Sequence, residues 1–259
     1  MTAKYVATTG SNSNPGTISQ PYLTWQKGLE NIVAGDVLYI RGGTYVEKIN
    51  STSQTVPYGT SFTNAVTIQG YTGETVILAP STDSAIKLNA SDRYQVWKDF
   101  VINGTSCTDD GVDIGGDNIT GPGFIRFENV EVKNVPSPDK QGILVWGGPG
   151  SCEFINVHSH HNDGDDNQSG HGIYISRPNC LIDGGEYNHN NSYGIHMYAS
   201  VANEDNTGCI VRRTRVHHND FGLLVTGGNN IQCYNNLSYL NANDGLIAEF
   251  GNASSGAKL

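Results

Sequence analysis

An eleven-residue segment recurs three times in the second half of the chain, and this recurrence restricts the fold more than any other feature. The copies are CEFINVHSHHN, CLIDGGEYNHN and CIVRRTRVHHN, and each runs from a cysteine to an asparagine ten residues later. Apolar and polar residues alternate over short stretches, and no stretch has the length of a useful helix. Short strands that return every 22 to 30 residues predict a β-solenoid, in which successive coils stack and share one core.

In a solenoid, the same position of every repeat falls into one column along the stack. Glycine–aliphatic pairs mark one strand of each coil: Gly142-Ile143, Gly172-Ile173, Gly194-Ile195, Gly222-Leu223 and Gly245-Leu246. Four cysteines are expected to form an internal stack of reduced thiols: Cys152, Cys180, Cys209 and Cys233. Four asparagines are expected to form a ladder at a turn, because asparagine tolerates the left-handed conformation: Asn162, Asn190, Asn219 and Asn243. Three histidines directly precede ladder positions, and their recurrence favours packing over a metal site: His161, His189 and His218.

The charge of the chain excludes some classes of partner. The 259 residues carry a net charge of −10, and this argues against nucleic acid, because phosphate binding needs a basic surface. An acidic polymer would have to bind through a local basic patch or a bridging cation. No apolar run reaches the length that spans a membrane, and the start MTAKYVATTG lacks the apolar segment of a signal peptide.

The first part of the chain has a different pattern. A turn-rich opening leads into a short amphipathic segment, Leu23 to Val33, and then into an apolar strand, Val37 to Ile40. We expect one domain over 1–259, with an N-terminal cap and first strands in 1–49, coils in 50–250 and a short tail in 251–259. The opening passage and the repeats together resemble right-handed parallel β-helix proteins of the pectate-lyase type over essentially the whole chain. The resemblance implies an all-β, right-handed parallel β-helix with a short N-terminal capping helix.

Three aspartates stand within five residues at Asp109-Asp110-Gly111-Val112-Asp113. Their carboxylates repel one another unless a cation neutralises them, and oxygen ligands suit Ca²⁺; the alternative is a solvated acidic turn. The segment resembles the DDGxD calcium-ligand motif of family-nine polysaccharide lyases, which implies Ca²⁺ at these aspartates, with Asp83 as a possible further ligand. Those lyases use a lysine base in a Gly-x-Lys context on the following coil. Here Leu144 stands at that place, and the nearest lysine is Lys140.

Alternation along the strands predicts which side chains point outwards. If the aliphatic residue of each glycine–aliphatic pair faces the core, the residues after it face out: Leu144, Tyr174, His196 and Leu224. Two residues further on, a second outward set follows: Trp146, Ser176, Tyr198 and Thr226. The residues before the glycines are Gln141, His171, Tyr193 and Phe221. One face is thus expected to gather a stripe suited to stacking on sugar rings, unless its rings merely stack on one another: Asp113, Trp146, His171, Tyr174, Tyr193, His196 and Tyr198.

An insertion precedes this stripe. Nine residues separate Asn162 from Gly172, whereas the following repeats use three, two and one. Long loops on a rigid repeat often carry function. The aspartates of this loop are either cation ligands or part of an ordinary polar loop: Asp163, Asp165 and Asp166. Arg177, on the same strand as Tyr174, is expected to pair with a carboxylate of substrate or loop.

These features favour a polysaccharide lyase that acts on an acidic, uronic-acid polysaccharide by β-elimination. Tyr174 or His196 would be base or acid, with Lys140 as a competing base, and calcium or Arg177 would hold the substrate carboxylate. The candidate substrate-binding residues are Trp146, His171, Arg177, Tyr193 and Tyr198. A uronate C5-epimerase, a glycoside hydrolase and a non-catalytic glycan-binding or adhesive solenoid remain alternatives. Each of these functions is expected outside the cell or on a cell or virion surface.

Overall fold

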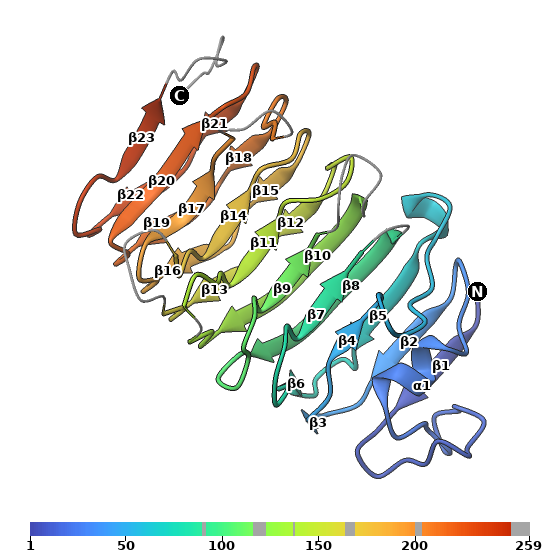
Figure 1. Cartoon of the computed structure of the whole chain (residues 1–259). Coiled ribbons are helices and arrows are strands. Elements are labelled where there is room, and N and C mark those ends of the chain that lie inside the picture. The colour runs from blue at the N-terminus through green and yellow to red at the C-terminus, as the bar shows by residue number, and fades with distance from the viewer. Residues whose placement is uncertain (90–91, 116–122, 137, 164–168, 200–203, 250–259) are drawn as a thin grey trace.

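The computed structural model describes residues 1–259 apart from 90–91, 116–122, 137, 164–168, 200–203 and 250–259. Its coils stack side by side from the N-terminal to the C-terminal end (Figure 1). Every strand pair in the described residues is parallel. One sheet has eight strands in the order β4 (Ile49–Asn50), β7 (Ile86–Leu88), β9 (Val112–Ile114), β11 (Ile143–Val145), β14 (Ile173–Ile175), β17 (Tyr193–Met197), β20 (Phe221–Thr226) and β23 (Leu246–Glu249).

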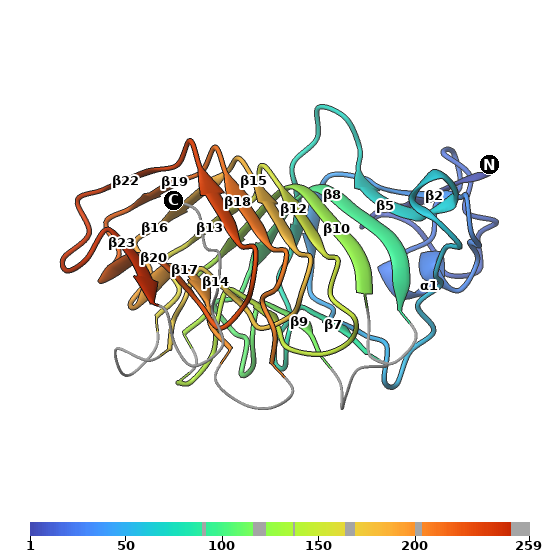
Figure 2. The same cartoon turned by 90° about the horizontal axis from the view of Figure 1, so that it is seen from above.

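The larger sheet has fifteen strands among the described residues. Its main path is β1 (Ala3–Val6), β2 (Val37–Ile40), β5 (Val66–Gly70), β8 (Arg93–Asn103), β10 (Gly123–Lys133), β12 (Glu153–Ile155), β15 (Leu181–Asp183), β18 (Ile210–Arg212) and β21 (Gln232–Tyr234). Two branches join this path. In the first, β3 (Gly43–Tyr45) pairs with β6 (Val76–Leu78), which pairs with β8. In the second, β10 pairs with β13 (His158–His160), which is followed in order by β16 (Glu186–Asn188), β19 (Arg215–His217) and β22 (Leu237–Tyr239). Figure 2, seen from above, separates β7 and β9 of the smaller sheet from β8 and β10 of the larger one.

The core lies inside the coils and consists of like side chains stacked in register. The aliphatic residues of the glycine–aliphatic pairs align across neighbouring strands, as expected from the sequence: Ile143, Ile173, Ile195, Leu223 and Leu246. On the opposite side Trp97, Phe127 and Phe154 stack with ring centroids 6.3 and 6.0 Å apart. Each of these three rings is fully buried, so the coils share one continuous apolar interior.

A short helix closes the N-terminal end of this core, as predicted. Helix α1 (Trp25–Leu29) begins after Thr24, whose hydroxyl accepts a hydrogen bond from the Lys27 N–H at 3.1 Å. The Glu47 carboxylate accepts a second one from the Trp25 N–H at 2.8 Å. Trp25 and Leu29 are fully buried, and the Trp25 ring packs edge-on against Phe100. A single 3₁₀ turn, η1 (Phe62–Asn64), completes the helical structure among the described residues. None of these helices is long and apolar enough to cross a membrane.

The asparagine ladder is present, with one residue different from the prediction. The side-chain amides of Asn162, Asn190 and Asn219 each donate to the next asparagine, at 2.8, 3.0 and 3.1 Å. The last acceptor is Asn241, and Asn243 instead is exposed and bonds Asp220. Gly172 has no room for a side chain, because a Cβ there would lie 2.5 Å from the Gly194 carbonyl oxygen and 2.8 Å from the Asn190 side-chain nitrogen.

The prediction for the cysteine stack is wrong at its last member, by the same two residues as the ladder. Cys152, Cys180 and Cys209 align as buried, free thiols, and the Cys180 N–H donates to the Cys209 sulfur at 3.4 Å. Cys233 is also free and buried, but it pairs with Val211 and so lies in the column of Phe154. The cause is the length of the last coil. Residues paired across β12, β15 and β18 are 28 and 29 residues apart, but those across β18 and β21 are only 22 apart.

The histidines before the ladder stack, in agreement with the packing interpretation. The rings of His161 and His189 lie 4.8 Å apart with an interplanar angle of 6°. The rings of His189 and His218 lie 5.0 Å apart at 5°. All three residues have positive φ, so each ring leaves the turn in the same direction.

We predict that Asn190→Ala lowers the free energy of unfolding by about 2–4 kcal/mol, because two buried ladder partners lose hydrogen bonds. Urea titration followed by circular dichroism measures this change. The matched control is Asn243→Ala, which removes an exposed asparagine and should cost less than about 1 kcal/mol. Equal losses in the two variants would show that the ladder does not continue through Asn241.

Candidate functional site

The three aspartates of the DDGxD segment converge. Asp109 and Asp110 precede β9, Asp113 lies in its middle, and each offers a carboxylate oxygen within 4.8 Å of the others. Two lysines reach the same place. Lys87 Nζ lies 3.2 Å from Asp109 and 2.6 Å from Asp113, and Lys140 Nζ lies 2.9 Å from Asp109. The acidic turn is therefore a compact cluster of carboxylates and ammonium groups, and we call these five residues the acidic cluster.

Burial makes the charge of this cluster costly. Burial raises the pKa of Asp110 to about 8, and the neighbouring carboxylates of Asp109 and Asp113 act in the same direction. The hydrogen bond to Asp109 raises the pKa of Lys140. Burial alone would lower the pKa of Lys87, but Asp113 and Asp109 outweigh it and hold that pKa above its usual value. Both lysines are thus ammonium ions at neutral pH in this arrangement.

The acidic cluster has the donor set of a hard cation but its oxygens are already engaged. Asp113 accepts from the Trp146 indole N–H at 2.8 Å as well as from Lys87. Asp110 accepts from the Gln141 backbone N–H at 2.6 Å. A divalent cation among these oxygens would take the place of the lysine ammonium groups, so the carboxylates fit Ca²⁺ only if Lys87 and Lys140 turn away.

Asp83 does not belong to the cluster. Its carboxylate lies 2.7 Å from Lys48 Nζ and pairs with that lysine instead. The expected role of Asp83 as a further ligand therefore has no support in the geometry of this cluster.

One outward column runs through the cluster. Across neighbouring strands, the paired residues are Lys87, Asp113, Leu144, Tyr174, His196 and Leu224. The alignment of Asp113 with Leu144 confirms that an aliphatic side chain stands directly beside the aspartate on the following coil. Lys87 lies on the preceding coil, and sequence reasoning overlooked it. The signal was present, since Ile86-Lys87-Leu88 alternates as Val112-Asp113-Ile114 does.

Four aromatic and imidazole rings gather further along this column. The rings of Tyr174 and His196 meet edge to face at 4.8 Å, and those of Tyr193 and His196 stack at 4.5 Å. His196 Nδ1 lies 2.8 Å from His171 Nε2. Trp146 is 38% exposed and is the most exposed ring of the stripe. Its indole N–H donates to Asp113 of the acidic cluster. The rings of the predicted stripe therefore lie close together, but they pack on one another, and two of its members, Asp113 and His171, are buried.

Hydrogen bonds determine the tautomers of the two histidines. The Tyr193 backbone N–H donates to His171 Nδ1 at 3.2 Å, so that nitrogen carries no proton. The proton of neutral His171 is then on Nε2, which donates to His196 Nδ1. Neutral His196 consequently carries its proton on Nε2, and burial lowers its pKa to about 3. His196 is placed to donate a hydrogen bond, whereas Tyr174 keeps its phenolic proton because burial raises its pKa.

Several residues expected to be exposed are buried. His171 is 1% exposed, because its ring is enclosed by Tyr174, Tyr193 and His196. Other positions of the outward sets are also buried: Ser176, Leu224, Thr226 and Gln141. Ser176 lies just past the end of β14, where its hydroxyl donates to the Val145 carbonyl at 3.4 Å and so turns inwards. Strict alternation fails there because the strand has ended.

Arg177 is 7% exposed and lies two residues beyond β14, not within that strand. Its Nε donates to the Trp146 carbonyl at 2.6 Å, which ties the end of β14 to the preceding coil. Among loop aspartates, Asp163 is exposed at the turn after the ladder. Asp165 and Asp166 lie outside the described residues.

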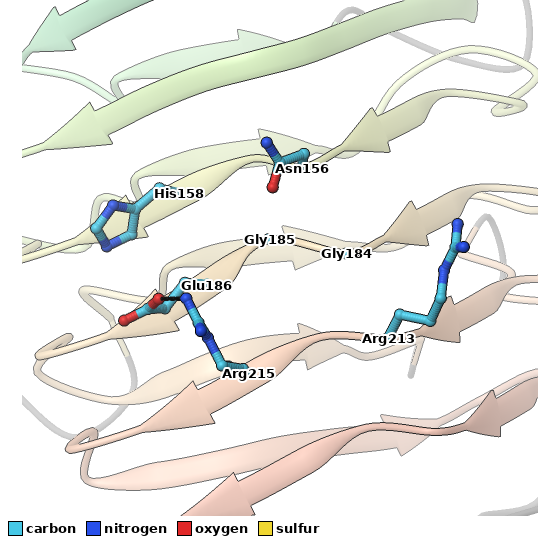
Figure 3. Close-up of a pocket in the computed structure, with 7 residues that line it drawn as sticks. All are labelled: Asn156, His158, Gly184, Gly185, Glu186, Arg213 and Arg215. Carbon is cyan, nitrogen blue, oxygen red and sulfur yellow. Dashed lines mark hydrogen bonds and ion pairs between the residues drawn. The ribbon is translucent and has the colours of Figure 1, made fainter.

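A hollow of about 480 Å³ lies on the larger sheet, away from the predicted site residues. Figure 3 shows Asn156 and His158 on one coil, Gly184, Gly185 and Glu186 on the next, and Arg213 and Arg215 on the third. The two glycines leave the space that side chains fill on neighbouring coils. The arginines are paired, Arg213 with Asp183 at 2.5 Å and Arg215 with Glu186. Sequence reasoning missed this hollow, although Gly-Gly at a bend and three arginines within residues 212–215 were visible signals.

Comparison with known proteins identifies the family. The sequence model described as Pel9A-like, right handed beta helix region matches residues 4–256. The chain belongs to this family. The helix is therefore right-handed, as the resemblance implied. No curated protein sequence matches the chain.

Solved structures share the fold of this Pel9A-like chain at low identity. A XylC protein in complex with xylose is 12% identical with a TM-score of 0.63, and the match covers 98% of this chain and 64% of that one. The GH136 lacto-N-biosidase from Eubacterium ramulus is 13% identical with a TM-score of 0.52, covering 90% and 44%. Pectate lyase Pel9A is 14% identical with a TM-score of 0.46, covering 99% and 76%. The chain thus spans less than two thirds of the first two structures, and the likeness to these two shows the fold alone.

We predict that acid destabilises the fold partly through His196. The folded-state pKa of about 3 lies below the unfolded value of about 6.5, so the unfolded chain takes up a proton that the folded chain does not. This contribution is present above pH 6.5 and is lost as the pH falls towards 3. His196→Gln should reduce the loss of unfolding free energy between pH 7 and pH 4 by about 3 kcal/mol. Urea titrations at several pH values measure this change, and equal pH profiles for His196→Gln and the wild type would contradict the prediction.

Proposed function

We propose that this chain is a polysaccharide lyase that cleaves an acidic, uronic-acid polysaccharide by cation-assisted β-elimination. The single observation that carries the proposal is the acidic cluster, in which three carboxylates and two lysines meet at one end of an aromatic stripe. Membership of the Pel9A-like family and the similarity to the DDGxD calcium motif support it. Proteins of known structure with this fold include one in complex with xylose and one lacto-N-biosidase, which supports a carbohydrate as the ligand. Action outside the cell is part of the same proposal.

The acidic cluster is the proposed calcium site, with Asp109, Asp110 and Asp113 as ligands. Calcium, when bound, would neutralise the substrate carboxylate and so acidify the proton on C5 of the uronate. The carboxylates that now hold Lys87 and Lys140 would then face the cation. Each lysine would lose the interactions that raise its pKa, because those interactions come from the same aspartates.

We assign the proton transfers to the two lysines. One neutral amine takes the C5 proton, the bond between C4 and the leaving oxygen breaks, and a double bond forms between C4 and C5. The other lysine, still an ammonium ion, donates the proton that the leaving oxygen needs. This assignment retains Lys140 as a base candidate and adds Lys87. It also explains how elimination proceeds although Leu144 occupies the position beside Asp113.

Tyr174 and His196 suit sugar binding better than proton abstraction. They lie two and three strands from Asp113 in the column, about 10 and 14 Å along the stack. The base must reach a carbon next to the carboxylate that the cation holds, and this distance is too long for that. Trp146, Tyr193 and Tyr198 would offer ring faces along the same stripe, while buried His171 and Arg177 would hold these rings and strands in place.

The direct test is the ultraviolet absorbance of newly formed unsaturated uronates on pectate, alginate and glycosaminoglycans, with calcium and with chelator. We expect a calcium-dependent rise on one polymer. Lys87→Met and Lys140→Met should each lower the rate by about 100-fold or more, the usual scale of acid–base catalysis. Tyr174→Phe should lower it less than about 10-fold, since it removes one contact to the sugar.

The matched control is Lys98→Met, because Lys98 pairs with Glu128 on the larger sheet and lies outside the acidic cluster. This variant should keep the full rate. A rate that falls with Tyr174→Phe but not with either cluster lysine would overturn the assignment of the base.

A second function, a non-catalytic glycan-binding or adhesive solenoid, is favoured by one observation. Leu144 stands beside Asp113, and both cluster lysines are held by carboxylates in this structure. If that arrangement persists with calcium, the aspartates are structural and the stripe only binds sugar. Binding to one polymer without any absorbance rise would establish this function in place of the lyase.

A further inference from the structure

Six of the eight histidines lie on one face of the larger sheet, whereas the acidic cluster is built around strands β7 and β9 of the smaller sheet. They are His158, His160, His161, His189, His217 and His218, on β13, β16 and β19 or in the turns that follow. His161, His189 and His218 form the outer row, with rings stacked almost parallel. His160, Asn188 and His217 form the inner row, at paired positions of the three strands.

Each inner histidine points one nitrogen at its outer neighbour. His160 Nδ1 lies 2.6 Å from His161 Nδ1. His217 Nδ1 lies 2.7 Å from His218 Nδ1. The outer residue of each pair has positive φ, 54° for His161 and 55° for His218, and this backbone turn brings the two rings together. Two nitrogen atoms therefore converge at each of two equivalent places on alternate coils.

A carboxylate orients the inner histidine of each pair from the opposite side. Glu131 lies 3.2 Å from His160 Nε2, and Glu186 lies 2.9 Å from His217 Nε2. The two glutamates are equivalent as well, since each sits on the preceding coil beside the start of the strand that carries its histidine. In Figure 3 the Glu186 side chain lies next to Arg215, which also pairs with it. A carboxylate on one imidazole nitrogen fixes the ring and leaves the other nitrogen as a ligand, as in many metal sites.

The middle coil breaks this pattern. Asn188 occupies the inner position. Its partner on the preceding coil is His158 in place of a glutamate, and His158 Nε2 lies 2.9 Å from the Asn188 side-chain nitrogen. His189 Nδ1 lies 2.6 Å from the Asn188 side-chain oxygen. The outer row is therefore continuous over three coils, whereas the glutamate-anchored pair occurs only on the first and third of them. Ring stacking alone explains the row but not this alternation.

We propose that His160 with His161, and His217 with His218, are two binding sites for divalent transition-metal ions. Each pair supplies two Nδ1 ligands, and water completes the coordination. Imidazole nitrogen suits copper, nickel and zinc, and copper(II) binds most strongly in that order. The sites are distinct from the acidic cluster in ligand type, since that cluster offers carboxylate oxygens for a hard cation.

The local geometry is compatible with a metal ion. Without metal, one Nδ1 of each pair carries a proton and donates to the other; with metal, that proton moves to Nε2 of the outer, exposed histidine, and both rings stay neutral. Two bonds of about 2.0–2.1 Å require the nitrogens to separate by a few tenths of an ångström. The outer rings line a hollow of about 400 Å³ together with Asp163 and Asn191, which offers room for the water ligands.

The test is equilibrium dialysis of the full chain against glycine-buffered Cu²⁺ in excess Ca²⁺, which competes for the acidic cluster but not for imidazole. We expect two copper ions per chain. His160→Asn and His217→Asn should each lose one, and the double variant should lose both. These substitutions reproduce the arrangement that the chain already has at Asn188, so the fold should tolerate them, and circular dichroism checks this.

His189→Gln is the matched control, because it changes the outer row where no histidine pair exists; it should keep both copper ions. Electron paramagnetic resonance gives an independent readout. Each copper should show coupling to two nitrogens, and the fully loaded protein should show broadening from two coppers about 10 Å apart that single variants lack. Copper binding that is absent in the wild type, or unchanged in the double variant, would overturn the proposal.

Discussion

The parallel hydrogen bonds that hold one coil in register with the next are the constraint on which the rest of this molecule depends. They place side chains from distant parts of the chain at one strand spacing, about 4.8 Å. Asp113 thereby lies between Lys87 and Leu144, although about thirty residues separate it from either neighbour along the chain. The same register aligns the ladder amides, the apolar core and the histidine rows. A change in coil length therefore shifts whole columns and not single residues.

The buried carboxylates show how this register creates chemistry. Three aspartates on one turn would be solvated in a flexible loop, but here the strand after them is fixed between two others. Burial and mutual repulsion raise the pKa of Asp110 to about 8, and two lysines approach to offset the charge. The cluster thus combines groups that bind a cation with groups that move protons. The histidine face uses the same principle with a different ligand set, because repetition brings equivalent glutamates and histidine pairs to alternate coils.

The fold was predictable from sequence because periodicity reports directly on stacking. The glycine–aliphatic column and the capping helix were found correctly, and three of the four expected cysteines and three of the four expected asparagines align. Cys233 and Asn243 were misplaced, because their ten-residue spacing persists while the last coil is shorter and shifts both by two residues. Coil length is set by how each turn closes in space, and no local pattern in the sequence records it.

The candidate site was predictable only in part. The acidic segment and the aromatic stripe could be read from residue types and alternation. Burial of His171 and Ser176 could not, since it depends on neighbouring coils and on where β14 ends. Lys87 was missed although its strand alternates as the strand of Asp113 does, because the partners that give it a role lie one coil away. Roles that depend on contacts between coils can be recognised only when the three-dimensional alignment of the coils is known.

The central claim is that the acidic cluster exchanges its lysines for a cation when it works. The most direct measurement is a crystal structure of the chain with Ca²⁺ and a uronate oligosaccharide, with the cation located by anomalous scattering. We expect a peak between Asp109, Asp110 and Asp113, with Lys87 and Lys140 turned away from these carboxylates and towards the sugar. A structure with the oligosaccharide bound, no cation among the aspartates and both lysines still paired with them would contradict it.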